Sequence, residues 1–185
     1  MKARPIGFAV AALVLALDQL AKWIVTGPLA LDRIGDQLAL LPIFDLNYVQ
    51  NQGISLGLLN ASNPVGRWML VGMTAAIAIA VGVWITREKN RLDQVALGMV
   101  LGGALGNIFD RVRFGYVTDF ADLHFRGIPP QLCPSYDNGL CRPFLVFNVG
   151  DAAISIGVVI LLLRAFVSRK DHREGHDPRE TIEHA

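Results

Sequence analysis

The segment "VFNVGDAAISIGVVILLL", residues 146–163, places an asparagine and an aspartate at the start of a long apolar run. Together with Phe144 and Leu145, the run reaches the ~20 residues that a helix needs to cross a hydrocarbon core of about 30 Å. An ionisable side chain in such a segment is costly, and it is a functional hypothesis by default. The segment therefore predicts a membrane-spanning helix whose first turn carries a carboxylate, Asp151, that needs an explanation.

Three other apolar segments support the same class of protein. The chain of 185 residues is 52% hydrophobic and only 18% charged, with a mean hydropathy of +0.41, which is unusual for a soluble domain of this length. The net charge of +1 gives no field that would attract nucleic acid. We therefore expect an all-α integral membrane protein, a bundle of four transmembrane helices spanning approximately residues 5–25, 67–86, 93–111 and 146–167.

The first apolar segment has a second interpretation, because Lys2 and Arg4 precede it as they would in a removable signal peptide. However, its helical pattern continues past Asp18 to Val25, and no small-x-small cleavage site follows. A retained helix is the better interpretation.

The basic residues predict the orientation of the four spans. They cluster before the first span, between the second and third, and after the fourth, and these three regions share one side of the membrane: Lys2, Arg4, Arg87, Lys89, Arg91, Arg164, Arg169, Lys170 and Arg173. Basic loops are retained in the cytoplasm. We expect both termini there, with a polar tail at 169–185 after a single domain at 1–168, and the connections 26–67 and 110–143 on the outer side.

Both cysteines of the chain, Cys133 and Cys141, lie in the second outer connection. Two cysteines in an oxidising compartment favour a disulfide that closes a small loop, although two free thiols in a mobile loop are the alternative. The spacing does not suit zinc, because there is no second cysteine pair and His124 is the one nearby histidine.

Several polar and small residues inside the spans predict helix packing. Asp18 and Lys22 are four residues apart and share a helix face, which favours a structural ion pair. Gly98, Gly102 and Gly106 recur every four residues, a pattern that allows another helix to approach closely.

The third span and the residues after it carry further polar groups. Asn107 needs hydrogen-bond partners at its depth and should point into the bundle. Arg111 could neutralise a carboxylate or hold a main-chain carbonyl. We expect Asp122 to be an ordinary solvated residue at the interface.

Asp119 and Asp151 should lie at one depth, because Asp119 follows the outer end of the third span and Asp151 opens the fourth from the same side. Two carboxylates in a partly dry site tend to share a proton, so that one can activate water while the other donates a hydrogen bond. This predicts acid–base hydrolysis without a metal or a cofactor. A simpler role for Asp151 is to cap its helix.

Five segments, in order, resemble the signature blocks of the lipoprotein signal peptidase (signal peptidase II) family: "DQLAK" (18–22), "NQGISLG" (51–57), "GALGNIFDR" (103–111), "GYVTDF" (115–120) and "FNVGD" (147–151). The resemblance covers approximately residues 5–167. It implies an aspartyl endopeptidase of the bacterial inner membrane that cuts prolipoproteins before a diacylglyceryl-modified cysteine. It also implies a small β-cradle in connection 26–67 and a site near the outer face.

The resemblance also implies roles for single residues. Asp119 and Asp151 match the catalytic pair. Residues that bind substrate or support the pair are Asn51, Gly53, Asn107, Arg111 and Asn148, and structural motif positions are Asp18, Lys22, Gly103, Asp110 and Gly115. The expected partners are the lipid-modified prolipoproteins and membrane lipid, and nothing requires more than a monomer.

The chain departs from the family pattern at Leu56, where phenylalanine is common, and at Gly150, where alanine is usual. The connection 121–146 is longer than usual. Three alternatives remain: a proton-coupled transporter using Asp18, Asp119 and Asp151, a magnesium enzyme using Asp110, Asp119 and Asp122, and a purely structural membrane protein.

Overall fold

The computed structural model describes residues 6–53, 64–137 and 139–174. Four helices make up the bundle: α1 (Ile6–Thr26), α2 (Pro64–Arg87), α3 (Arg91–Arg113) and α4 (Val149–Glu174). All four are long and apolar enough to cross a membrane, α4 over Val149–Val167. The four-helix membrane fold expected from the sequence is therefore confirmed, and Leu56 lies outside the described residues.

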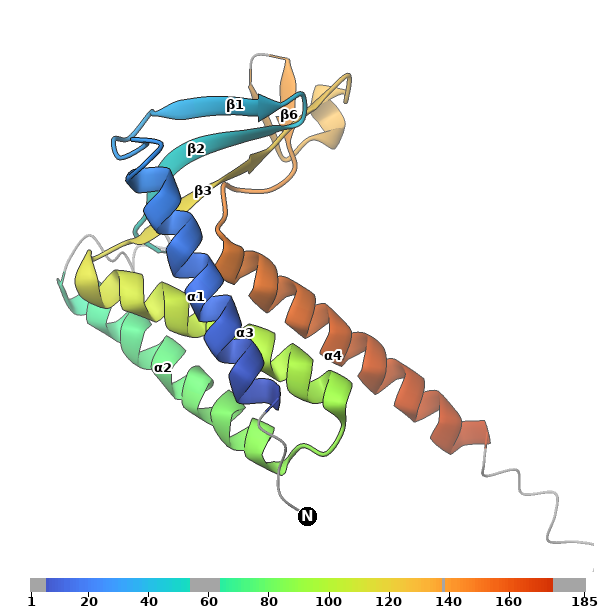
Figure 1. The fold of residues 1–185 in the computed structure, drawn as a ribbon. Helices are drawn as coiled ribbons and strands as arrows, with labels where there is room; N and C mark the ends of the chain where they lie inside the picture. Colours follow the sequence, from blue (N-terminus) through green and yellow to red (C-terminus); the bar gives the residue numbers. More distant parts are fainter. Residues whose placement is uncertain (1–5, 54–63, 138, 175–185) are drawn as a thin grey trace, which may run out of the picture.

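The central helix of the bundle is α3, which packs against the other three helices (Figure 1). Its apolar side chains Leu97, Leu101 and Ala104 form the core together with Ala11 of α1 and Ala78 of α2. Large apolar side chains on the outer faces of α1, α2 and α4 are exposed instead. Exposed apolar helix faces around a buried centre are what contact with lipid requires.

The glycine ladder of α3 is a packing surface, as predicted. A Cβ atom at Gly98 would collide with the carbonyl oxygen of Gly7, and one at Gly102 would lie 2.5 Å from that of Ala11. Both contacts are with α1. Gly103 faces α4 in the same way, against the main chain of Gly150.

Two small antiparallel sheets lie at one end of the bundle (Figure 1). The first contains β1 (Gln37–Leu41), β2 (Phe44–Asn51) and β3 (Val117–Leu123), in that order. The cradle was expected within connection 26–67, which supplies β1 and β2. Its third strand, β3, comes from the second outer connection, 110–143. β3 follows α3 directly, so the sheet is fixed to the central helix.

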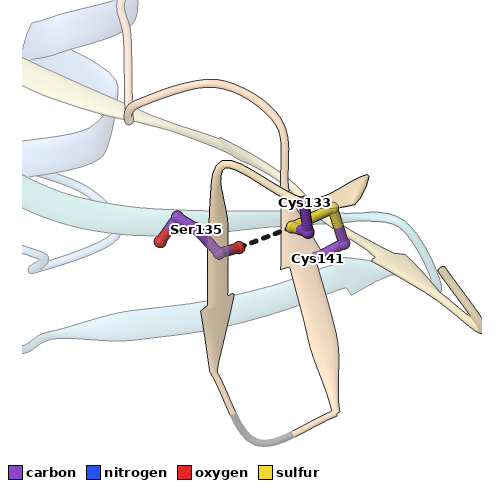
Figure 2. The surroundings of a disulfide bond; sticks show 3 residues. All are labelled: Cys133, Ser135 and Cys141. Atoms are coloured by element: carbon purple, nitrogen blue, oxygen red, sulfur yellow. Dashed lines mark hydrogen bonds between the residues drawn. A yellow bond between two sulfur atoms is a disulfide. The ribbon is translucent and has the colours of Figure 1, made fainter. Parts of the chain in front are cut away.

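The second outer connection contains a small sheet that the sequence did not predict. It forms a sheet in the order β4-β6-β5, from β4 (Phe125–Arg126), β5 (Ser135–Asp137) and β6 (Leu140–Arg142), with a short 3-10 helix at Pro130–Leu132. A disulfide joins Cys133 to Cys141 in β6, with Cα atoms 5.6 Å apart (Figure 2). We refer to residues 124–143 as the cap.

The opposite end of the bundle contains the start of α1, the α2–α3 connection and the later turns of α4 (Figure 1). Asn90 caps α3 there by accepting hydrogen bonds from the main-chain N–H groups of Leu92 and Asp93. Arg164 of α4 binds both carboxylate oxygens of Asp93, at 2.9 and 3.2 Å. α4 continues to Glu174, six residues past the domain end expected at 168, and residues 175–185 of the expected tail lie outside the described residues.

Candidate active site

Asp119 lies on β3 with its carboxylate held by two side-chain amides. Asn51, at the end of neighbouring β2, donates a hydrogen bond to Oδ2 at 2.8 Å. Asn148 donates to Oδ1 at 2.6 Å. Asp119 is 1% exposed, so the sheet register and the start of α4 together fix a carboxylate that water hardly reaches.

Asp151 lies in the first turn of α4, where it forms a capping box with Asn148. The side-chain oxygen of Asn148 accepts the main-chain N–H of Asp151 at 2.9 Å, and Oδ2 of Asp151 accepts the main-chain N–H of Asn148 at 3.3 Å. Helix α4 begins at Val149, so Asn148 is the N-cap residue. Asp151 is therefore not the N-cap residue. It is the third residue of the helix, and its carboxylate completes the capping box by accepting the N–H of Asn148.

Asn107 connects the two carboxylates through a third amide. Its Nδ2 donates to Oδ1 of Asp151 at 2.8 Å, and its Oδ1 accepts from the amide of Asn148 at 3.1 Å. As predicted, Asn107 points into the bundle, and the structure gathers Asn51, Asn107 and Asn148 around Asp119 and Asp151. Each asparagine presents a donor to a carboxylate, which suits an ionised or singly protonated pair.

The two carboxylates differ in environment. The pKa of the Asp119 carboxyl is raised to about 6, chiefly by burial and also by the charge of nearby Asp151, while the hydrogen bonds from Asn51 and Asn148 act in the opposite direction. Asp151 is only partly buried and lines an apolar pocket of about 290 Å³ with Phe147, Ser155 and Ile156. One carboxylate is thus enclosed by amides, and the other faces a cavity.

Arg111 is a partly buried cation next to this pair. Its Nη1 is 3.5 Å from the carbonyl oxygen of Asn107, a long hydrogen bond, and its Nε is buried without a partner in the part of the chain that the structure describes. An unused buried donor is costly, so Arg111 is a candidate for binding a ligand.

A second polar network, on α1 and α3, supports the start of α4. Lys22 lies 2.6 Å from Asp18 and 2.9 Å from Asp110, so the expected Asp18–Lys22 pair also includes a carboxylate of α3. Oδ1 of Asp18 accepts the main-chain N–H of Gly150 at 2.9 Å. Gln19 donates to Asp18 at 3.2 Å and Asp110 at 3.0 Å. Asp18 therefore fixes the turn of α4 that carries Asp151.

Gln19 is a residue of this network to which the sequence assigned no role. The available signal was its polarity next to Asp18 within an apolar helix. Asp110 also accepts the main-chain N–H of Thr118 at 3.1 Å, and this bond connects the network to the strand that carries Asp119.

The expected motif glycines have backbone or packing roles. Gly53 (φ +93°) donates its N–H to the side chain of Asn51 at 2.9 Å and thereby orients the amide toward Asp119. Gly115 (φ +90°) forms the turn from α3 to β3. Both backbone conformations strongly favour glycine. Gly103 allows α4 to approach α3 beside Asn107.

The expectation that Asp122 is a solvated interfacial residue is wrong. Asp122 is fully buried, 3.0 Å from Nε of Arg142 in the cap, and Asn47 donates to it at 3.4 Å. Its strand partner is Asp45, which lies 3.7 Å from His124. The cap is thus attached to the sheet by buried charges, a role that depends on strand pairing and has no local signal.

The carboxylates proposed for a magnesium site have different partners. Asp110 binds Lys22, Asp119 binds asparagine amides and Asp122 binds Arg142. Across residues 6–53, 64–137 and 139–174, no group of three or more His, Cys, Asp or Glu side chains is placed to hold a metal ion. The donor sets therefore favour hydrogen-bonded carboxylates over metal ligands.

The fold and the site define a multi-pass membrane protein with two carboxylates at one end of its helix bundle. Residues 10–167 match the profile of the signal peptidase (SPase) II family. A lipoprotein signal peptidase of Rhizorhabdus wittichii is 52% identical over 167 residues, covering 90% of this chain and 89% of that protein. The lipoprotein signal peptidase of Sphingopyxis alaskensis is 48% identical over 161 residues, covering 87% and 85%.

A solved structure has the same architecture. It is a bacterial membrane enzyme determined by the in meso method, 26% identical, with a TM-score of 0.70 over 89% of this chain and 90% of that one. The chain therefore belongs to the lipoprotein signal peptidase family. It is an aspartic peptidase of a bacterial membrane, in the family that cleaves the signal peptides of prolipoproteins.

Proposed function

We propose that Asp119 and Asp151 are the catalytic pair, and that they cut the peptide bond before a diacylglyceryl-modified cysteine without a metal or a covalent intermediate. The observation that carries this proposal is the amide network of Asn51, Asn107 and Asn148, which holds both carboxylates together.

The different surroundings of the two carboxylates support different roles. Asp119 is buried with a raised pKa, so it holds the shared proton and donates it to the scissile carbonyl oxygen. Asp151 faces the apolar pocket and acts as the base that takes a proton from the attacking water. Substrate that covers the pocket removes water, and this raises the proton occupancy of Asp119 further.

The remaining polar groups position the substrate. Arg111 has a buried Nε without a partner among the described residues, and this donor suits a main-chain carbonyl of the substrate. The pocket beside Asp151 is lined mainly by apolar side chains, among them Phe144, Leu145 and Phe147. It receives the apolar part of the substrate, which arrives from the lipid.

We further propose that both termini are cytoplasmic, that the sheets and the site are at the outer face of the inner membrane, and that a monomer is active. Arg87 at the end of α2, Arg91 at the start of α3 and Arg164 of α4 lie toward the end of the bundle opposite the sheets, and they support this orientation. An active monomer is supported because both carboxylates and the three asparagines around them belong to one chain.

The test compares a prolipoprotein with and without diacylglyceryl on its cysteine, using wild type, Asp119→Asn and Asp151→Asn in detergent, each with and without EDTA. We expect cleavage of the lipid-modified substrate alone, loss of activity in both variants, and no effect of EDTA. Arg111→Lys should retain folding and reduce kcat/KM, because one short ammonium replaces the guanidinium fork.

Activity in either aspartate variant would refute the catalytic pair. Loss of cleavage on chelation would favour the magnesium enzyme instead. An Asp151→Asn variant that remains fully active would leave Asp151 as a member of the capping box only.

A further inference from the structure

A cavity separate from the candidate active site lies between the sheet-side ends of α1 and α3 and the underside of the sheet. It has a volume of about 580 Å³, within the usual range for ligand sites. Neither Asp119 nor Asp151 lines it. The Lys22–Asp110 pair forms its inner wall and separates it from the carboxylate pair.

The walls of this cavity have the composition of a membrane interface. Trp23, Phe109 and Phe114 line it, and each is at least 45% exposed. Deeper in, the hydroxyl groups of Tyr48 and Tyr116 are 3.1 Å apart. Aromatic side chains at the ends of transmembrane helices lie at the depth of lipid headgroups. The opening is therefore at the level where a phospholipid headgroup meets its acyl chains.

Two charged residues that line the cavity have no partner of opposite charge in the described part of the chain. Arg113 is stacked over the rings of Phe109 and Phe114, at 5.9 and 5.0 Å, and it forms no ion pair with a carboxylate of the described residues. Asp32 is exposed at the rim, and its main-chain N–H is fixed by the side chain of Asp36. Lys22 and Asp110, by contrast, already bind each other.

One unpaired positive and one unpaired negative group around a single cavity complement a zwitterion. We propose that this cavity binds a phospholipid with a phosphoethanolamine headgroup, with its phosphate on Arg113, its primary ammonium on Asp32 and its acyl chains along Trp23 and Phe109. An ammonium donates hydrogen bonds to a carboxylate, whereas the quaternary amine of choline has no N–H to donate. Phosphatidylglycerol has the same phosphate but a neutral glycerol in place of the ammonium, so it offers Asp32 no cation.

Trp23 supplies a direct probe, because the chain has only three tryptophans. With Trp68→Phe and Trp84→Phe in place, the emission of Trp23 is recorded in detergent micelles during titration with dioctanoyl phosphatidylethanolamine. Matched titrations use the phosphatidylcholine and phosphatidylglycerol of the same chain length, and free phosphoethanolamine and inorganic phosphate.

We expect a saturable change in Trp23 emission with phosphatidylethanolamine. Phosphatidylcholine and phosphatidylglycerol should bind about tenfold more weakly, because each loses one charge-assisted hydrogen bond. Arg113→Gln and Asp32→Asn should each weaken binding by a similar factor. Arg33→Gln is the matched control, since Arg33 is exposed nearby and does not line the cavity. Size-exclusion profiles and melting temperatures check that each variant is folded.

Equal responses to the three lipids, unaffected by Arg113→Gln, would overturn the proposal and leave only general lipid contact. Saturation by free phosphoethanolamine or phosphate at the same concentration as the lipid would also overturn it, because the ligand would then be a soluble phosphate. Retained binding in Asp32→Asn would refute the assignment of the ammonium.

Discussion

The side-chain amide of Asn148 donates a 2.6 Å hydrogen bond to Asp119, which precedes it by 29 residues. The oxygen of the same amide caps the helix that carries Asp151. One fully buried side chain therefore sets the position of one carboxylate and the backbone next to the other. The site and the start of α4 are for this reason a single structural unit.

Two substitutions of Asn148 should separate these functions. Asn148→Ser keeps an N-cap acceptor but is too short to donate to Asp119, so it should retain the cap's share of the stability while kcat/KM falls by about a hundredfold. Asn148→Ala loses the cap as well, and should also cost about 1 kcal/mol of stability. Cleavage of a lipid-modified substrate and thermal unfolding measure the two effects. Unchanged activity in Asn148→Ser would show that the amide does not position Asp119.

The raised pKa of Asp119 predicts the direction of a pH effect on stability. The folded protein holds this proton up to a pH of about 6, well above the range in which an unfolded aspartate loses it. Between pH 4 and 6 the folded state therefore binds more protons, so its stability should fall as pH rises through this window. Asp119→Asn cannot ionise, and its melting temperature should decline less from pH 4 to 7. Parallel curves for the two proteins would contradict the raised pKa.

The sequence was sufficient for the helices because length and continuous apolarity specify a membrane span without reference to tertiary contacts. It also placed Asp119 and Asp151 at one depth, because residues at the same end of successive spans share an interface. The glycine ladder identified the close approach of α1 to α3. Each of these inferences depends on residues close together in sequence, or on the alternation of spans.

The main error concerns a residue whose partners are far apart in sequence. Asp122 is buried because β2 and β3 pair in a particular register and because Arg142 returns from the cap. The N-cap is Asn148 and not Asp151, which the sequence offered as a helix cap, and this difference is local because both residue types are good N-cap candidates. The short strands of the cap carry no hydrophobic alternation long enough to predict them.

A methyl group at Gly106 should weaken the network that supports the turn of α4 carrying Asp151. The added Cβ would lie 2.5 Å from Oδ2 of Asp18, and moving this carboxylate disturbs its bonds to Lys22 and Gly150. We expect Gly106→Ala to cost about 1–3 kcal/mol, as overpacking usually does, and to lower activity. Gly82→Ala in α2 is the matched control because, apart from the backbone of its own helix, no atom of the described residues lies within 4 Å of its Cβ position. Similar melting temperatures for the two variants would show that α1 moves aside freely.

The buried charge of Asp122 predicts how the cap is attached. Arg142→Met would leave this carboxylate without its cation, and removal of one partner from a buried pair costs about 3 kcal/mol or more. The double variant Asp122→Asn, Arg142→Met has no buried charge at that site and should recover part of the loss. The measurements are thermal unfolding and amide hydrogen exchange. In Arg142→Met, exchange should rise over the cap, residues 124–143, before it rises in the helices. Equal destabilisation by the single and double variants would show that cap attachment depends on packing and the Cys133–Cys141 disulfide rather than on this ion pair.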